Sequence, residues 1–212
     1  MVRAWVAGWA CSRDLPPAEE VAEGVLRTPV GAPGREVELL VLDADRHPRR
    51  TDVAARASWD ERDPWVTVPT TDPGRVADRL AEHGLATADV PEWLMTRSLA
   101  ASPAAPLPPG YTATTSRPGP HRAEVGITAP HGSPAAWGQV GLVRAVAVPD
   151  RISTVAAHRR RGLGSVVMGL LGDAAVEAGA DRGVLVASDE GRRLYLTLGW
   201  EPVCAVVVAR RR

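Results

Sequence analysis

The stretch that most constrains the fold is a basic, glycine-containing turn between a strand-like and a helix-like segment. Residues 151–155, RISTV, have the composition of a strand, and residues 165–178 carry apolar side chains at helical spacing. The turn over residues 159–165, RRRGLGS, holds Gly162 and Gly164. Glycine tolerates unusual dihedrals and lets a ligand approach the backbone closely. Free N–H groups at a helix start, with the positive end of the helix dipole, suit a phosphate or pyrophosphate.

The residues after this turn extend the pattern. Gly179 follows the helical segment as a C-terminal cap would, and residues 183–187, GVLVA, have the composition of a buried strand. Ser188 is a suitable N-cap for a second helix over residues 189–198. Residues 200–209 are again strand-like. The C-terminal part therefore has the order strand, glycine turn, helix, strand, helix, strand.

This order and two motifs resemble the core of the GCN5-related N-acetyltransferase (GNAT) superfamily. The acyl-CoA signature of that family is Arg or Gln, two residues, Gly, one residue, then Gly or Ala, which fits Arg159, Gly162 and Gly164. A second signature is a Tyr shortly before a Gly-aromatic pair, which fits Tyr195 and Gly199-Trp200. Two motifs in the right order are more specific than either alone.

The resemblance is sharp over residues 145–212 and extends from about residue 109. It implies an α+β or α/β fold with a mixed, mostly antiparallel, twisted sheet flanked by helices. We expect residues 1–99 to form a small α/β N-terminal unit of unassigned role. Residues 100–110, AASPAAPLPPG, are expected to form a Pro/Ala-rich linker, and residues 111–212 a GNAT-like acetyl-CoA-binding domain.

The N-terminal unit shows its own pattern of helices and strands. Trp5 and Trp9 lie one helical turn apart, which predicts a helix with one face on a core. Asp72 and Pro73 predict the start of another helix. The remaining elements expected here are a short helix over 18–24, a hairpin over 25–42, a helix over 48–58, and strands at 65–68 and 93–99.

The second unit is expected to begin with a strand over residues 111–115. A hairpin over 123–143 and a strand over 146–155 follow. Members of the family usually carry two helices between their first two strands, where they help to build the acceptor site. Only residues 116–122 fill that interval here. We therefore hypothesise that the N-terminal unit packs against the second unit and supplies the missing wall.

The resemblance also implies roles for individual residues. The backbone around Arg160 to Ser165 would hold the pyrophosphate of acetyl-CoA, and the strand end would run along the pantetheine arm. A backbone N–H group there could stabilise the oxyanion. Neighbouring arginines project differently, so any one of them could instead be solvated. The predicted coenzyme-binding residues are Thr154, Val155, Ala156, Arg159, Arg160, Arg161, Gly162, Leu163, Gly164, Ser165 and Ser188.

The resemblance assigns proton transfer to the departing sulfur to Tyr195 as general acid. The alternative is a core tyrosine on an amphipathic helix. The general base stays unassigned, because the strand before the glycine turn offers Ile152, Ser153 and Thr154 but no carboxylate. The candidates for that role are Asp150 and Glu124.

These features lead to one main hypothesis and two alternatives. The main one is an acetyl-CoA-dependent N-acetyltransferase that transfers an acetyl group to an unidentified amine by direct attack in a ternary complex. The first alternative is a CoA-binding sensor or interaction module without catalysis. The second is a nucleotide- or nucleic-acid-binding turn, which the lack of lysine and of a dinucleotide fingerprint disfavours.

Composition limits the other classes of function. The 25 basic and 25 acidic residues cancel, which argues against a general nucleic-acid binder. Cys11 and Cys204 form no metal-binding or disulfide pattern, and no metal site is expected. No apolar run predicts a membrane span, and the codon-biased composition suggests a bacterial, cytoplasmic protein. Edge strands of such sheets often pair, so a homodimer is one of the oligomeric states left open.

Overall fold

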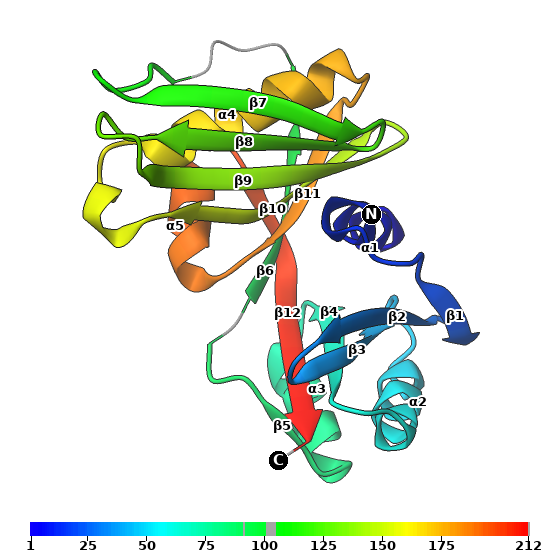
Figure 1. The fold of residues 1–212 in the computed structure, drawn as a ribbon. Helices are drawn as coiled ribbons and strands as arrows, with labels where there is room; N and C mark the ends of the chain where they lie inside the picture. Colours follow the sequence, from blue (N-terminus) through cyan, green and yellow to red (C-terminus); the bar gives the residue numbers. More distant parts are fainter. Residues whose placement is uncertain (91, 101–104, 212) are drawn as a thin grey trace.

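The computed structural model describes residues 1–90, 92–100 and 105–211 (Figure 1). The α-helices are α1 (Val2–Arg13), α2 (Arg49–Ala57), α3 (Pro73–Glu82), α4 (Leu163–Glu177) and α5 (Asp189–Thr197), and short 3₁₀ turns are η1 (Ser58–Asp60) and η2 (Ala156–His158). The strands are β1 (Glu19–Ala22), β2 (Val25–Ala32), β3 (Arg35–Val41), β4 (Pro64–Thr70), β5 (Leu85–Thr87), β6 (Glu92–Ser98), β7 (Thr112–Gly119), β8 (Arg122–Thr128), β9 (Pro134–Val143), β10 (Val146–Thr154), β11 (Arg182–Ala187) and β12 (Glu201–Arg211).

One continuous sheet runs through the molecule in the order β1-β2-β3-β4-β12-β6-β11-β10-β9-β8-β7, and β5 also pairs with β12. We call β1–β5 with α2 and α3 the first lobe, and β7–β11 with α4 and α5 the second lobe. Figure 1 shows β12 passing from one lobe to the other. Among the described strand pairs only β3–β4 and β10–β11 are parallel. The predicted mixed, mostly antiparallel sheet flanked by helices is confirmed.

The two predicted units share strands. β6 belongs to the predicted N-terminal unit, yet it lies between β11 and β12. β12, from the other end of the chain, pairs with β4 and β5 of the first lobe. The boundary at residues 100–110 stays a prediction, and positions 101–104 of that segment lie outside the described residues.

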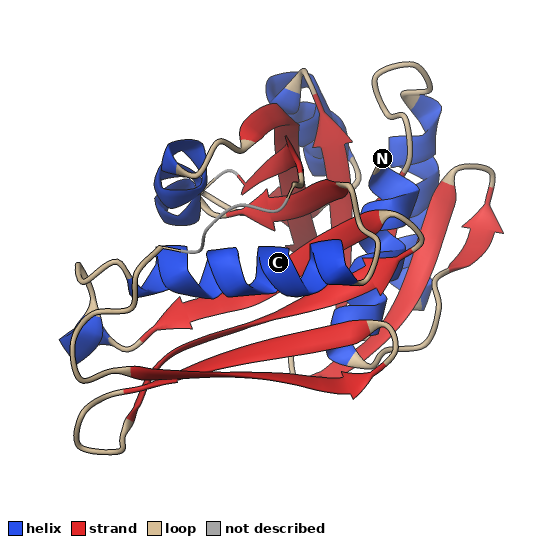
Figure 2. Cartoon of the chain, turned by 90° about the horizontal axis from the view of Figure 1, so that it is seen from above, coloured by secondary structure: helices blue, strands red, loops and turns tan. Residues whose placement is uncertain are grey.

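Helix α1 packs between the lobes, against β9 and β10 of the second lobe. Trp5 and Trp9 are buried in a cluster that also includes strand residues of both lobes, as their helical spacing predicts. The helix comes very close to β9, because Gly8 faces Gly141 with no side chain on either residue. α4, the longest helix, lies across the strands of the second lobe (Figure 2). The contacts of α1 with β9 and β10 confirm that the N-terminal residues pack against the second unit, as we hypothesised.

The first lobe repeats the architecture of the second. The order β3, α2, β4, α3 matches the order β10, α4, β11, α5, and the two strands are parallel in both cases. In both repeats a side chain caps the second helix: Asp72 accepts a hydrogen bond from the Arg75 backbone at 3.1 Å, and Ser188 accepts one from the Gly191 backbone at 3.2 Å. The chain therefore contains two related strand–helix–strand–helix units.

Some local predictions were wrong or incomplete. Residues 18–24 were expected to be helical, but residues 19–22 form β1, which pairs with β2. This pairing gives hydrogen-bond partners to the backbone groups on the outer edge of β2. The three-residue strand β5 was not predicted, since it is too short to show periodicity. The absence of helices between the first two strands of the second lobe is confirmed, because β7 leads directly into β8.

Candidate coenzyme site and acceptor face

The parallel strands β10 and β11 separate soon after they begin. They pair only at Val146 with Arg182 and at Ala147 with Gly183, although both strands continue well beyond these residues. A bulge at residues 150–153 of β10, where Arg151 has φ 53°, turns the backbone further. Backbone groups on the edge of β10 that faces β11 are therefore free of a strand partner past residue 147. We call this opening between the two strands the slot.

The glycine turn presents free N–H groups beside the slot. Arg160 and Gly162 have positive φ values of 60° and 75°, and no side chain caps the start of α4. Within the described part of the chain, no backbone N–H from Arg160 to Gly164 donates a hydrogen bond to another protein group. Consecutive N–H groups in such a turn form an anion-binding nest, which the dipole of α4 strengthens. The free N–H donors expected at the start of α4 are therefore present.

A groove of about 360 Å³ joins this turn to the end of β10 and one face of α5. It brings together most of the predicted coenzyme-binding residues, together with Tyr195. The lining residues are Ile152, Ser153, Thr154, Arg159, Arg160, Gly162, Leu163, Gly164, Ser165, Ser188, Glu190, Gly191, Leu194 and Tyr195. Val155, Ala156 and Arg161 are not among them. The side chain of Leu163 is buried in the core, so that residue can offer only its backbone.

Sequence reasoning identified Ser188 and Tyr195 but missed three further residues of α5 in this groove. Glu190, Gly191 and Leu194 line it alongside Tyr195. Gly191 and Tyr195 stand three and seven residues after the N-cap Ser188, which is the spacing of one helical face. That periodicity was visible in the sequence and could have identified the face. The Ser188 hydroxyl caps α5, as predicted, while it also borders the groove.

Tyr195 lines the groove from α5. Its ring packs against Trp200, with centroids 6.2 Å apart, and the side chain is buried among residues of β6 and β11. Burial, helped by the negative charge of Asp150, raises the pKa of Tyr195 to about 12. The phenol therefore keeps its proton throughout the neutral range.

The two carboxylates suggested as general bases are both engaged by arginine. Asp150 accepts hydrogen bonds from the guanidinium of Arg13 at 2.7 and 2.8 Å, from Ser12 at 3.1 Å and from Gln139 at 3.2 Å. Burial acts to raise the pKa of Asp150, but these donors outweigh it and lower the pKa below its usual 3.8. Glu124 forms an ion pair with Arg122. Neither carboxylate lines the groove, and a role for either as base stays a prediction.

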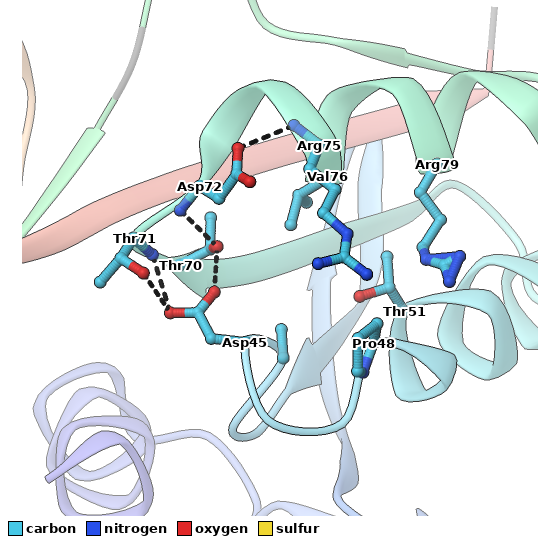
Figure 3. A pocket seen from close by; sticks show the side chains of 10 residues that line it. Asp45, Pro48, Thr51, Thr70, Thr71, Asp72, Arg75, Val76 and Arg79 are labelled. Carbon is cyan, nitrogen blue, oxygen red and sulfur yellow. Dashed lines mark hydrogen bonds between the residues drawn. The ribbon is translucent and has the colours of Figure 1, made fainter.

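The first lobe has a pocket at the position that corresponds to the groove. This pocket of about 190 Å³ lies between the loop before α2 and the start of α3 (Figure 3). Asp45 reaches into it and accepts hydrogen bonds from the backbone and hydroxyl of Thr71 and from the hydroxyl of Thr70. β3 also stays paired with β4 from Val37 to Leu40, close to its end at Val41, so no slot opens there. Asp45 thus occupies the donors before α3, the place that corresponds to Ser188 before α5 in the second lobe.

Comparison with known proteins supports the fold. The sequence matches no family model and no curated protein. A GCN5-related N-acetyltransferase from Kribbella flavida is similar in structure at 20% identity, with a TM-score of 0.66, over 96% of this chain and 91% of that one. A tandem GNAT protein from the clavulanic acid biosynthesis pathway is similar at 16% identity, with a TM-score of 0.59, over 88% of this chain and 77% of that one.

A third structure, a GCN5-related N-acetyltransferase from Sphaerobacter thermophilus, is similar at 15% identity with a TM-score of 0.63, over 89% of this chain and 76% of that one. The chain therefore has the fold of the GCN5-related N-acetyltransferases. The similarity covers both lobes, which corrects our expectation that only the C-terminal half resembles that family. Sequence signatures were limited to the second lobe, because the first lobe keeps the order of elements but has no glycine turn before α2.

Among the residues that the structure describes, no helix is both long and apolar enough to cross a membrane.

Proposed function

We propose that the protein is an acetyl-CoA-dependent N-acetyltransferase whose coenzyme site is the groove in the second lobe. The observation that carries the proposal is the free N–H nest at the start of α4, next to a slot between two parallel strands. The nest suits the pyrophosphate, and Arg159 and Arg160 on the groove wall add positive charge. The free edge of β10 suits the amides of the pantetheine arm, which would pair with it like an added strand.

In this proposal the thioester lies in the slot, between Tyr195 and the bulge of β10. Strand-like pairing fixes the position of the thioester, so much of the rate gain is positional. A backbone N–H group of the bulge stabilises the negative charge on the carbonyl oxygen while an amine attacks. Tyr195 donates a hydrogen bond and then a proton to the departing sulfur. A tyrosine whose pKa is about 12 is a strong base once ionised, so it regains a proton at once.

The proposal is tested by calorimetric titration with acetyl-CoA. Wild type is expected to bind it, and Gly162→Ala to bind it more weakly, because alanine at φ 75° costs about 1–2 kcal/mol and distorts the nest. Gly172→Ala is the matched control: it lies within α4, and a Cβ there meets nothing within 4 Å. Absence of binding to wild type at millimolar acetyl-CoA would refute the proposal.

The second candidate is a CoA-binding module without catalysis. Two observations favour it: both candidate bases, Asp150 and Glu124, are paired with arginines, and Glu190 is the one carboxylate among the described lining residues of the groove. Tyr195→Phe separates the two candidates. A transferase would keep its affinity for acetyl-CoA and lose about 100-fold in turnover. A non-catalytic binding module would acetylate no amine, whether as wild type or as Tyr195→Phe.

A further inference from the structure

The acceptor side of the slot is built by the N-terminal part of the chain. The coenzyme groove lies on the face of the sheet that carries α4 and α5. An acceptor must therefore reach the thioester from the opposite face, where α1 packs. Ser12 and Arg13 at the end of α1 bind Asp150 at the edge of the slot, so the C-terminal end of α1 borders this face.

β6 brings a carboxylate to this same face. Side chains of β6 alternate between the two faces: Trp93 and Met95 belong to the cluster around Tyr195, whereas Leu94 belongs to the cluster around α1. Glu92 is two residues from Leu94, so it lies on the α1 face. Trp93 pairs with Ala187, the last residue of β11, which places Glu92 beside the open end of the slot.

The charges around Glu92 leave it as the unpaired member of a cluster. Arg13 on α1 is bound to Asp150, and Arg35 on β3 is bound to the buried Glu38 at 2.6 Å. Glu92 lies in the electrostatic field of both arginines and of Glu38. Within the described residues, however, it has no hydrogen bond and no ion pair within 4.0 Å. Two guanidinium groups therefore face three carboxyl groups, and Glu92 is the one of the three that has no bonded arginine among the described residues.

The surroundings of this carboxylate are partly apolar and aromatic. Arg13 and Arg35 stack on the ring of Trp9 at 5.0 and 5.3 Å, and Arg35 also stacks on Trp65 at 4.6 Å. Glu92 is partly buried. Burial raises its pKa, and the positive charges of Arg35 and Arg13 oppose that effect. A carboxylate whose pKa is shifted toward neutrality is better matched to taking up a proton near pH 7 than an ordinary one.

We propose that Glu92 is the acceptor-side base, and that the acceptor is an amine which arrives as an ammonium ion. This inference rests on the proposed function and adds to it a catalytic residue on the acceptor side. The carboxylate of Glu92 attracts the ammonium group, takes one of its protons and passes that proton to water.

The reaction balances as follows. The free amine lone pair attacks the thioester carbon, a C–N bond forms, and the carbonyl electrons move to oxygen. The intermediate collapses, the C–S bond breaks, and its electrons pass to sulfur, which receives a proton from Tyr195. The second proton lost by the nitrogen restores the tyrosine through water. One ammonium ion and acetyl-CoA thus give an amide, CoA and one proton in solution.

The test uses the full chain and a panel of 1,5-diaminopentane, tyramine and a lysine-containing peptide, with free CoA measured by chromatography. Glu92→Gln is expected to bind acetyl-CoA within about two-fold of wild type, and to lose about 100-fold or more in kcat/KM. Wild type should show a fall in kcat/KM below the pKa of Glu92, whereas in Glu92→Gln this limb should be replaced by a rise that continues up to the pKa of the amine itself. Glu92→Asp should retain the limb at a lower rate.

Glu201→Gln is the matched control, because Glu201 is an exposed strand residue that does not line the groove, and its strand partner Thr96 lies four residues along β6 from Glu92. It should behave as wild type, and equal melting temperatures would show that the variants fold. Wild-type turnover with an unchanged rate and pH profile in Glu92→Gln would overturn the role of Glu92 while leaving the transferase proposal intact. Failure of wild type to bind acetyl-CoA would overturn both. Binding without acetylation of any amine in the panel would overturn the inference and favour the non-catalytic module.

Discussion

Replacing Gly141 by alanine tests how α1 is held against the second lobe. An added Cβ on Gly141 would lie 1.8 Å from the carbonyl oxygen of Gly8 and 2.9 Å from the backbone nitrogen of Ser12. Real Cβ atoms keep at least 3.0 Å from such neighbours, so the helix would have to move by roughly 1.2 Å, the difference between 3.0 and 1.8 Å. Because the obstacles are backbone atoms, no side-chain rotation can relieve the contact.

We expect Gly141→Ala to cost about 3 kcal/mol, the upper part of the usual range for overpacking a core. For a chain of this length the melting temperature should fall by about 6–12 °C. The displacement would also pull Arg13 away from Asp150 and disturb the acceptor face. Acetyl-CoA affinity should change by less than about three-fold, since the groove lies on the other face of the sheet.

Thermal unfolding followed by circular dichroism measures the effect, with Gly172→Ala as control. That glycine lies in α4 with open space around its Cβ position, so alanine should raise stability by up to about 1 kcal/mol. A melting temperature of Gly141→Ala within about 2 °C of wild type would refute the close approach of α1 to β9.

Three further perturbations follow from the same structure. Asp150→Asn should lower stability by about 2–4 kcal/mol at pH 7, because it leaves its arginine partner without a counter-charge. The pKa of Asp150 is lowered in the folded state, so its carboxylate stabilises the fold above about pH 4. This stabilisation is lost as the pH falls through the folded pKa. The difference in unfolding free energy between wild type and Asp150→Asn, measured by chemical denaturation, should therefore shrink in acid. Ser188→Ala should cost about 1 kcal/mol in thermal unfolding through loss of the N-cap of α5, whereas Ser188→Asn should not. Burial raises the pKa of both thiols, Cys11 and Cys204, so in the folded protein each should react with a thiol reagent at pH 8 at least about ten-fold more slowly than after denaturation.

The sequence was most informative where local chemistry decides local structure. The caps at Asp72 and Ser188, the hairpin of β2 and β3, and the glycine turn before α4 all depend on residues within a few positions of each other. The pairing of β6 with β11 and β12 could not be predicted in this way. It joins residues 92–98 to residues 182–206, and no local pattern specifies which strand edge a given strand will meet.

The same limit explains what sequence reasoning missed in the site. Tyr195 and the glycine turn could be identified because they carry short motifs. Glu92, the base that we propose, could not, because its place on the face that carries α1 depends on strand order and on the packing of α1. Asp150 was proposed as a base from its place near the glycine turn, but its bonds to Arg13 and Ser12 come from the far end of the chain.

The two repeats show how few residues separate an open groove from a closed pocket. In the second lobe, glycine at position 162 leaves N–H donors free, and the strands part after two paired residues. In the first lobe, the backbone N–H groups of Arg46 and His47 before α2 donate to the Asp43 carbonyl at 3.1 and 2.9 Å, and the strands stay paired. The first lobe thus bonds its own N–H donors internally and acts as a support for the second. Arg13 on α1 and Glu92 on β6 then lie next to the second lobe. We therefore expect one molecule of acetyl-CoA per chain, and a calorimetric stoichiometry of two would contradict this division of roles.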